Sequence, residues 1–169
     1  DESTTFKALF HFNKANNYNE FVRGLRFFSG PPQNIIYSDT KGNIALNLPG
    51  KFPIKFPGQG KFILDGSDPN SEWKKYIPFE HRLERYNHPQ GFLSSANQFP
   101  VDITTYPYYV YSHRFENYRN RRINDRLITM QNIEPEDLMS LQNDNFNYIA
   151  SEILPYLLSQ LDTLSLNED

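Results

Sequence analysis

The feature that most restricts the fold of this 169-residue chain is a 21-residue segment, from Pro49 to Pro69, crowded with helix and strand breakers. Proline stands at four of its positions and glycine at four more. Proline lacks a backbone N–H and glycine weakens both helices and strands, so little room is left for a regular element. A structureless connection of this length is uncommon in a compact domain and is usually functional or packed on other structure. We therefore expect a long irregular loop here.

Regular elements are predicted on the N-terminal side of this loop. Residues 5–12 alternate loosely between apolar and polar, which favours a strand. Apolar residues at helical spacing predict an amphipathic helix over 18–28. Two short runs, 34–38 and 44–48, flank the turn sequence Asp-Thr-Lys-Gly-Asn at 39–43. This pattern is typical of a β-hairpin.

The C-terminal side is predicted to be mostly helical. Aromatic residues make 106–111 strand-like, whereas 117–128 and 135–141 have helical patterns. The last helix carries a wide apolar stripe, made of Phe146, Ile149, Ala150, Ile153, Leu154, Leu157, Leu158 and Leu161. The order of helix, strands, loops and helices indicates the α+β class, in a single partial domain over 1–169.

Large aromatic side chains and an apolar helix face are rarely left in water together. We therefore predict a core that includes six of these residues: Trp73, Phe79, Phe92, Ile149, Ile153 and Leu157.

Composition excludes several classes of protein. Aromatic residues make up 15% of the chain, which is too many for a wholly disordered segment. The absence of cysteine removes disulfides, thiolate metal sites and a cysteine nucleophile. No apolar run has the length of a membrane span, and the N-terminus has no signal-peptide pattern.

Charge is distributed unevenly along the chain. All 17 Lys and Arg lie at or before Arg126, whereas eight acids and no base follow. The two parts could attract each other, or the acidic part could face a basic surface elsewhere. The net charge of −3 argues against a nucleic-acid partner.

Individual motifs give little chemistry when they are taken alone. The four histidines, at 11, 81, 88 and 113, lack metal-ligand spacing, and solvated loop histidines are the better interpretation. Asp65, Asp68 and Glu72 lack the spacing of a calcium loop. The arginines at 114, 119, 121, 122 and 126 fit the charged outer face of a helix better than a nucleic-acid patch. Asn97 has the position of a turn residue.

A series of motifs in order resembles the penicillin acylase (penicillin amidase) family of N-terminal-nucleophile hydrolases. It begins with Gln-Asn-Ile-Ile-Tyr-Ser-Asp at 33–39 and Gly-Asn-Ile at 42–44, and continues with Gly-Lys-Phe-Pro-Ile-Lys at 50–55. The later motifs are Trp-Lys-Lys-Tyr-Ile-Pro-Phe-Glu at 73–80, Asn-His-Pro-Gln-Gly-Phe-Leu at 87–93, Ala-Asn-Gln at 96–98, Tyr-Arg-x-x-Arg-Ile at 118–123 and Leu-Gln-x-Asp at 141–144. Seven motifs in sequence over about 110 residues make coincidence an inadequate explanation.

The resemblance implies roles for two residues. Asn97 falls where the family has the asparagine of its oxyanion hole, and Arg119 keeps the spacing of the family's active-site arginine. Asn97 would donate a hydrogen bond to the oxyanion, and Arg119 would help to orient Asn97 and the nucleophile. We therefore expect Asn97 at the end of a strand, facing an open concavity, with the Arg119 guanidinium on the same side. The family's acidic calcium ligand aligns with Tyr108, with Asp102 out of register, so no metal or cofactor is expected through this chain.

The resemblance also implies what lies outside the chain. The family's nucleophile is a serine at the start of its β-chain, and this chain begins with Asp1. We therefore expect a C-terminal-side piece of the β-chain, within a four-layer αββα architecture whose partners are the α-chain and the remainder of the β-chain. Alone, it should be inactive and should expose apolar surface through which it could dimerise or rearrange.

The expected activity of the parent protein is hydrolysis of a linear amide, with a penicillin-type or N-acyl substrate. A periplasmic or secreted location follows from the resemblance alone. The alternative from another class is a non-catalytic binding or scaffold module, in which the 25 aromatic residues line a ligand surface.

Overall fold

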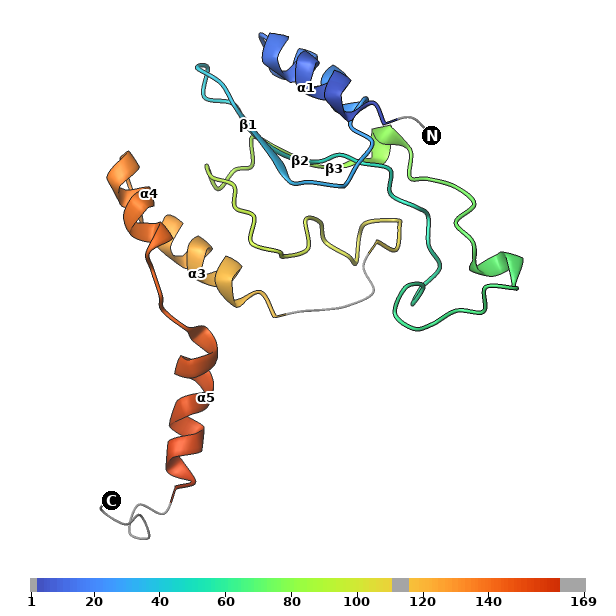
Figure 1. The fold of residues 1–169 in the computed structure, drawn as a ribbon. Coiled ribbons are helices and arrows are strands. Elements are labelled where there is room, and N and C mark those ends of the chain that lie inside the picture. Colours follow the sequence, from blue (N-terminus) through green and yellow to red (C-terminus); the bar gives the residue numbers. More distant parts are fainter. Residues whose placement is uncertain (1–2, 111–115, 162–169) are drawn as a thin grey trace. The chain divides into compact units, whose positions relative to one another are not determined.

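The structure is a computed structural model that describes residues 3–110 and 116–161. The chain divides into two compact units, residues 1–115 and residues 116–169. The first holds two helices and a three-stranded sheet, and the second holds three helices (Figure 1). A mixture of helices with a small antiparallel sheet confirms the α+β class. The single partial domain over 1–169 stays a prediction.

The sheet of unit 1 is antiparallel, in the order β1-β2-β3. Strands β1 (Ile35–Ser38) and β2 (Ile44–Leu48) form the predicted hairpin, with Ser38 opposite Ile44. β3 (Leu83–Tyr86), which the sequence patterns did not indicate, pairs with β2 on its other side. β2 is therefore the central strand, and its last four residues are buried.

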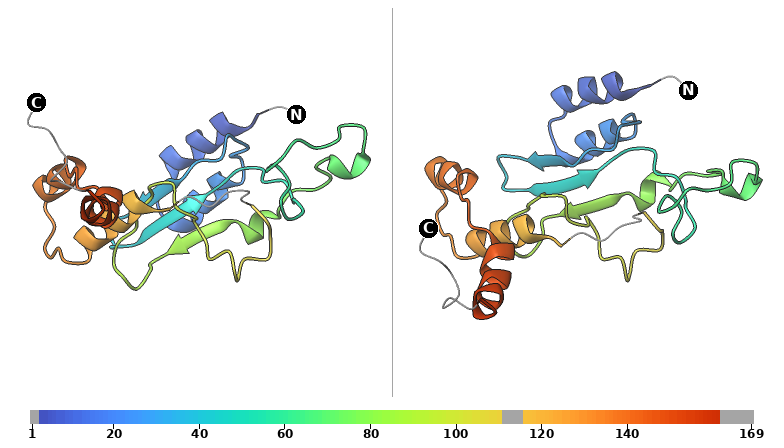
Figure 2. Two further views of the ribbon diagram at one scale, coloured as in Figure 1. Left: turned by 90° about the horizontal axis from the view of Figure 1, so that it is seen from below. Right: turned by 60° about the horizontal axis from the view of Figure 1, so that its bottom comes forward.

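Helix α2 (Tyr18–Leu25) confirms the predicted amphipathic helix, and Asn17 caps it by accepting a hydrogen bond from Glu20 N at 3.0 Å. The layers of unit 1 are α1, then α2, then the sheet (Figure 2). The chain that follows β3 runs along the side of the sheet opposite α1 (Figure 1). The core between these layers consists of Ala8, Phe21, Leu25, Phe28, Ala45, Leu46, Leu48 and Leu83.

The predicted strand over 5–12 is wrong, because these residues belong to helix α1 (Thr5–Lys14). In the helix Ala8 and Phe12 share one face, and the Phe12 ring stacks on Phe21 of α2 at 4.7 Å. Gly24 allows this close approach, because a Cβ there would lie 2.9 Å from both His11 and Phe12. Short apolar runs do not distinguish strand from helix, and here packing against α2 decides.

The segment from Pro49 to Pro69 contains no helix or strand, as predicted, and ends at a 3-10 turn over Pro69–Ser71. It is nevertheless ordered by two contacts. The base is closed by Ile54 N donating to Lys75 O at 2.9 Å and Ile77 N donating to Phe52 O at 2.8 Å. Further out, the buried side chain of Gln59 donates to Ser71 O at 2.9 Å.

Unit 2 contains α3 (Tyr118–Leu127), α4 (Pro135–Gln142) and α5 (Tyr148–Ser159), which confirm the three helices predicted there. No residue of the described part of unit 2 is buried. Its helices are joined by polar contacts, including a bidentate ion pair from Arg122 of α3 to Asp144, with distances of 2.7–3.1 Å. Arg121 pairs with Glu152 of α5 at 2.7 Å. Basic and acidic parts of the chain thus attract each other inside this unit.

The predicted core was wrong at several positions. Trp73 is 60% exposed, and Phe79 and Phe92 are half-buried. On α5 the stripe residues Ile149, Ile153 and Leu157 are exposed, although the helix itself forms as predicted. The strand predicted over 106–111 is also absent from its described part, where Tyr109 makes one isolated bridge to Lys55. Tyr111 lies outside the described residues.

Candidate active site

Asn97 lies in a short loop after β3 that is closed by the side chain of its neighbour Gln98. The Ala96 N–H donates to Gln98 Oε1 at 2.6 Å, and Gln98 Nε2 donates to Ser94 O at 2.7 Å. Asn34, next to β1, donates from Nδ2 to Ser95 Oγ at 2.7 Å and ties the loop to the sheet. The loop is therefore held both internally and against the hairpin.

The backbone of Asn97 has a φ of +64°, in the left-handed region. Asparagine is one of the few residues apart from glycine that adopts this conformation readily. The side chain is exposed. These features confirm Asn97 as a turn residue. Its expected place at the end of a strand is wrong, because β3 ends at Tyr86 and irregular chain follows.

The start of this irregular chain is fixed by a network of side chains at the hairpin turn. Asn87, directly after β3, accepts from Ile44 N at 2.9 Å through Oδ1 and donates to Asn43 Oδ1 at 2.8 Å. The Asp39 carboxylate accepts from Asn43 and Lys41 N–H groups at 2.9–3.0 Å and from the Tyr37 hydroxyl at 2.9 Å. These bonds, led by the Asn43 side chain, lower the pKa of Asp39 to about 2. The hairpin and Asn87 motifs thus contain the residues that fix the hairpin turn to the end of β3.

Arg119 is the second residue of α3 in unit 2, and its side chain is exposed. The neighbouring arginines have structural partners: Arg121 bonds Glu152 and Glu116, and Arg122 bonds Asp144. This supports the charged helix face over a nucleic-acid patch for these two arginines, while Arg114 lies outside the described residues. Since Asn97 and Arg119 belong to different units, their pairing stays a prediction.

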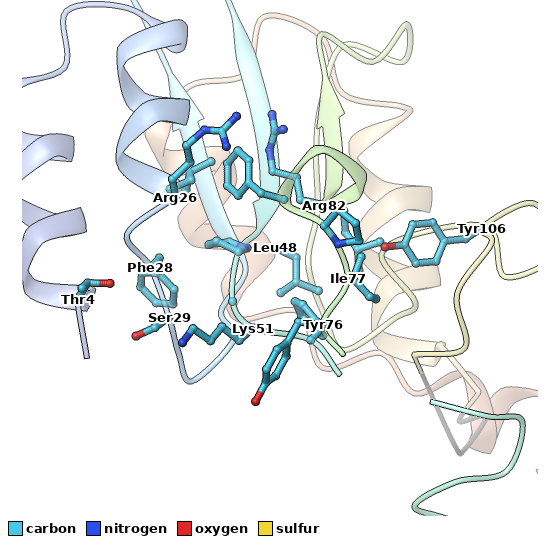
Figure 3. Close-up of a pocket in the computed structure, with 17 residues that line it drawn as sticks. Thr4, Arg26, Phe28, Ser29, Leu48, Lys51, Tyr76, Ile77, Arg82 and Tyr106 are labelled. Carbon is cyan, nitrogen blue, oxygen red and sulfur yellow. The ribbon is translucent and has the colours of Figure 1, made fainter. Parts of the chain in front are cut away.

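A pocket of about 160 Å³ lies elsewhere in unit 1, between the end of α2, the end of β2 and the start of β3 (Figure 3). Neither Asn97 nor Arg119 lines it. Arg26 and Arg82 lie on one side in this view, and their guanidinium groups are 4.3 and 4.9 Å from the centre of the Phe79 ring. Each arginine is also engaged by a carboxylate, Arg26 by Glu80 at 3.1 Å and Arg82 by a glutamate of β3 at 2.7 Å.

Three comparisons with known proteins bear on the family and the fold of this chain. The family model described as penicillin amidase matches residues 1–169, the whole chain. The chain belongs to the penicillin amidase family. Members of this family are hydrolases, so the expected hydrolase and acylase character of the chain's family is confirmed.

Curated relatives include two proteins named acyl-homoserine lactone acylase QuiP. The one from Pseudomonas fluorescens is 28% identical over 98 residues, which cover 57% of this chain and 12% of the relative. The one from Pseudomonas putida is 24% identical over 153 residues, covering 86% of this chain and 18% of the relative. The chain thus spans less than a fifth of the length of these acylases.

A solved structure shares the fold. The thermostable penicillin G acylase from Alcaligenes faecalis matches with a TM-score of 0.70 at 20% identity, covering 95% of this chain and 29% of that chain. The predicted resemblance to part of an N-terminal-nucleophile hydrolase fold is therefore confirmed. At this identity the likeness concerns the fold alone.

Tyr108, where the resemblance would place the calcium ligand of the family, has no carboxylate. The Tyr108 hydroxyl lies 2.6 Å from His81 Nδ1, and Asp102 closes its own turn by accepting from Thr104. Within residues 3–110 and 116–161, no three His, Cys, Asp or Glu side chains are grouped to hold a metal ion. Asp65 and Asp68 likewise accept hydrogen bonds within their own turns. His113 lies outside the described residues.

Sequence reasoning missed a polar cluster beneath α2. The Tyr18 hydroxyl donates to the Glu84 carboxylate, which also binds Arg82, and it lies 3.1 Å from Asn47 Oδ1. Burial, followed by the Glu84 carboxylate, raises the pKa of Tyr18 to about 12. Asn47 Nδ2 and Arg82 Nε are buried there without a hydrogen-bond partner among the described residues. The polar residue at 47 in an apolar strand was the only signal of this cluster.

No helix in the described part of the chain has both the length and the apolarity needed to span a bilayer.

Proposed function

We propose that the protein carrying this chain is an amidase that cleaves a linear amide into a carboxylic acid and an amine. The observation that carries the proposal is the family match over residues 1–169. The loop around Asn97 supports it further, because an exposed asparagine on a fixed backbone is suited to bind an oxyanion.

In the proposed mechanism Asn97 is the oxyanion donor. Its side-chain NH₂ donates a hydrogen bond to the oxygen of the tetrahedral intermediate, where negative charge develops. The nucleophile is an N-terminal serine outside this chain, whose oxygen adds to the amide carbonyl while its own amine removes the hydroxyl proton. That proton passes to the leaving nitrogen as the C–N bond breaks, and water then hydrolyses the serine ester to the carboxylic acid. Arg119 orients Asn97 and the nucleophile through its charged, multidentate guanidinium group.

Two substrate classes fit the proposal. Penicillin-type amides follow from the family and from the solved relative, which is named a penicillin G acylase. The names of both curated relatives favour N-acyl homoserine lactones as a second class. Both substrates contain an acyl group on a secondary amide, so the same oxyanion donor would serve either reaction.

The remaining proposals concern the surroundings of the chain. We propose the α-chain and the remainder of the β-chain as its partners, and export to the periplasm as its location. The chain by itself should lack amidase activity, because it offers no cysteine and no recognisable pairing of a serine with a base. Turnover by the purified chain alone would contradict this last statement.

The test is hydrolysis of penicillin-type amides and N-acyl homoserine lactones by the full-length, self-processed protein. Asn97→Gly is the decisive variant, because glycine keeps the left-handed backbone and removes only the donor. We expect kcat to fall by roughly 10²–10³-fold with little change in substrate binding. Asn132→Gly is the matched control, since Asn132 also has a positive φ, of 51°, in unit 2.

Full activity of Asn97→Gly would show that Asn97 is only a turn residue. No turnover of any amide by the correctly processed wild-type protein would favour the non-catalytic binding module instead.

A further inference from the structure

The side chain of Gln98, next to Asn97, makes two hydrogen bonds to the backbone of its own loop. Its Oε1 accepts from Ala96 N at 2.6 Å, and its Nε2 donates to Ser94 O at 2.7 Å. One carboxamide therefore bridges two backbone groups that precede Asn97 in the sequence. Both of these polar contacts lie within one five-residue segment. Gln98 is half-buried, whereas Asn97 is exposed. The glutamine side chain therefore serves the backbone of this loop.

These two bonds restrict the backbone on which Asn97 is carried. The bridge joins the residue after Asn97 to the residue before it, and Asn97 lies between them with a φ of +64°. An exposed loop without such a bridge would sample several backbone conformations. The bond from Asn34 to Ser95 Oγ, at 2.7 Å, fixes the same segment to the start of β1.

An oxyanion donor requires this kind of support. Its hydrogen bond stabilises the transition state only if it already points to where the charge develops, since reorganisation during the reaction would cancel the gain. Displacement of a reacting group by about 1 Å can cost about 10²-fold in rate. A residue that fixes the loop without contacting the substrate would thus act on kcat through Asn97.

We propose that Gln98 is a positioning residue of the amidase, whose side-chain bridge between Ala96 N and Ser94 O holds Asn97 in its donating orientation. This inference rests on the proposed function, because it assigns Gln98 a task only if Asn97 binds the oxyanion.

The experiment uses the full-length, self-processed acylase and an amide that the wild-type protein hydrolyses. Gln98→Met keeps the length of the side chain and removes both bonds. Gln98→Glu keeps an acceptor for Ala96 N but loses the donor to Ser94 O. The matched control is Gln90→Met, because Gln90 Nε2 also donates to a loop carbonyl, Phe92 O, at 2.8 Å.

We expect Gln98→Met to lower kcat by about 10- to 100-fold, with KM within about 2-fold of wild type because Gln98 is not expected to contact the substrate. Gln98→Glu should fall between Gln98→Met and wild type, and Gln90→Met should leave kcat unchanged. The melting temperature of each variant is measured in parallel. If Gln98→Met does not fold, the reduced kcat of Gln98→Glu carries the test.

A double-mutant cycle separates positioning from a general structural role. In the Asn97→Gly background Gln98→Met should have no further effect on kcat, since the donor that it positions is absent. Equal effects of Gln98→Met in both backgrounds would overturn the inference, as would an unchanged kcat in Gln98→Met. Either result leaves the role of Asn97 intact, whereas full activity of Asn97→Gly refutes the proposed role of Asn97 and this inference with it.

Discussion

The two units of this chain use different interactions to define their structure. Unit 1 buries leucines such as Leu25, at 1% exposure, and Leu83, at 3%, between two helices and a sheet. Unit 2 has no buried residue in its described part, although α5 is rich in leucine and isoleucine. Its helices are connected instead by ion pairs and aromatic contacts, such as Arg121 over the Tyr148 ring at 4.6 Å.

This difference shows that an apolar stripe predicts a helix without predicting what covers it. The amphipathic pattern of α2 is satisfied because the β-hairpin lies against it, as the Phe21–Tyr37 ring contact at 5.1 Å shows. The similar pattern of α5 has no comparable layer in the described part of its own unit, where Leu157 is 53% exposed. The same periodicity is therefore accompanied by burial of the apolar helix face in unit 1 and by its exposure in unit 2, so only in unit 1 does it stabilise the fold through burial.

The largest expected effect tests burial directly. Leu25→Ala should destabilise the protein by about 2–5 kcal/mol, because it leaves a cavity in a packed core. Leu157→Ala, the matched change in α5, should alter stability by about 0.5 kcal/mol or less. Urea denaturation of both variants measures the difference. If Leu157→Ala lowered the free energy of unfolding as much as Leu25→Ala, α5 would be covered in the intact protein. The two units would then not differ in how their apolar residues are buried.

A smaller effect tests the polar connection of unit 2. Asp144 accepts three hydrogen bonds from Arg122, which lower its pKa, and it also accepts from Phe146 N at 3.1 Å. Asp144→Asn should lower the melting temperature by a few degrees, because it removes the charge that Arg122 binds. The loss should shrink only in part in 1 M salt, because the two charged side chains are half-buried and salt screens such pairs less than exposed ones. Glu136→Gln, an exposed acid on α4, is the control.

A salt-independent loss in Asp144→Asn, or an equal loss in Glu136→Gln, would show that packing rather than charge connects these helices.

The smallest effect concerns pH and the hairpin of unit 1. Because folding lowers the pKa of Asp39 from its usual 3.8 to about 2, the unfolded chain binds the proton more readily. Its contribution to stability is complete above pH 4 and is lost as the pH falls towards 2. Asp39→Asn should therefore reduce the loss of stability between these values, measured by urea denaturation at several pH values. An unchanged acid dependence would show that the carboxylate does not support the turn.

Several features of the fold followed from local sequence. Proline and glycine fixed the absence of helix and strand between Pro49 and Pro69, because these residues act on their own backbone. The hairpin was predictable for the same reason, since Asp39 and Gly42 shape its turn locally, the glycine with a φ of +82°. Helix α5 followed from its periodicity.

Other features depended on contacts between distant residues. β3 is a strand because β2 offers it a free edge, and residues 83–86 show little strand pattern by themselves. Residues 5–12 form a helix because Phe12 packs against Phe21 and Gly24 of α2. The order within the long loop comes from backbone bonds between residues 52–54 and 75–77 at its base and from the bond of Gln59 to the Ser71 carbonyl.

The candidate site divides in the same way. The sequence alone determined the family and singled out Asn97 and Arg119, because ordered motifs preserve residue type and spacing along the chain. Only the tertiary structure decided how Asn97 is held, since its support comes from the side chains of Gln98 and Asn34. Such a hydrogen bond needs a particular distance and direction between donor and acceptor. The folded backbone sets both, and the spacing of residues along the sequence does not specify them.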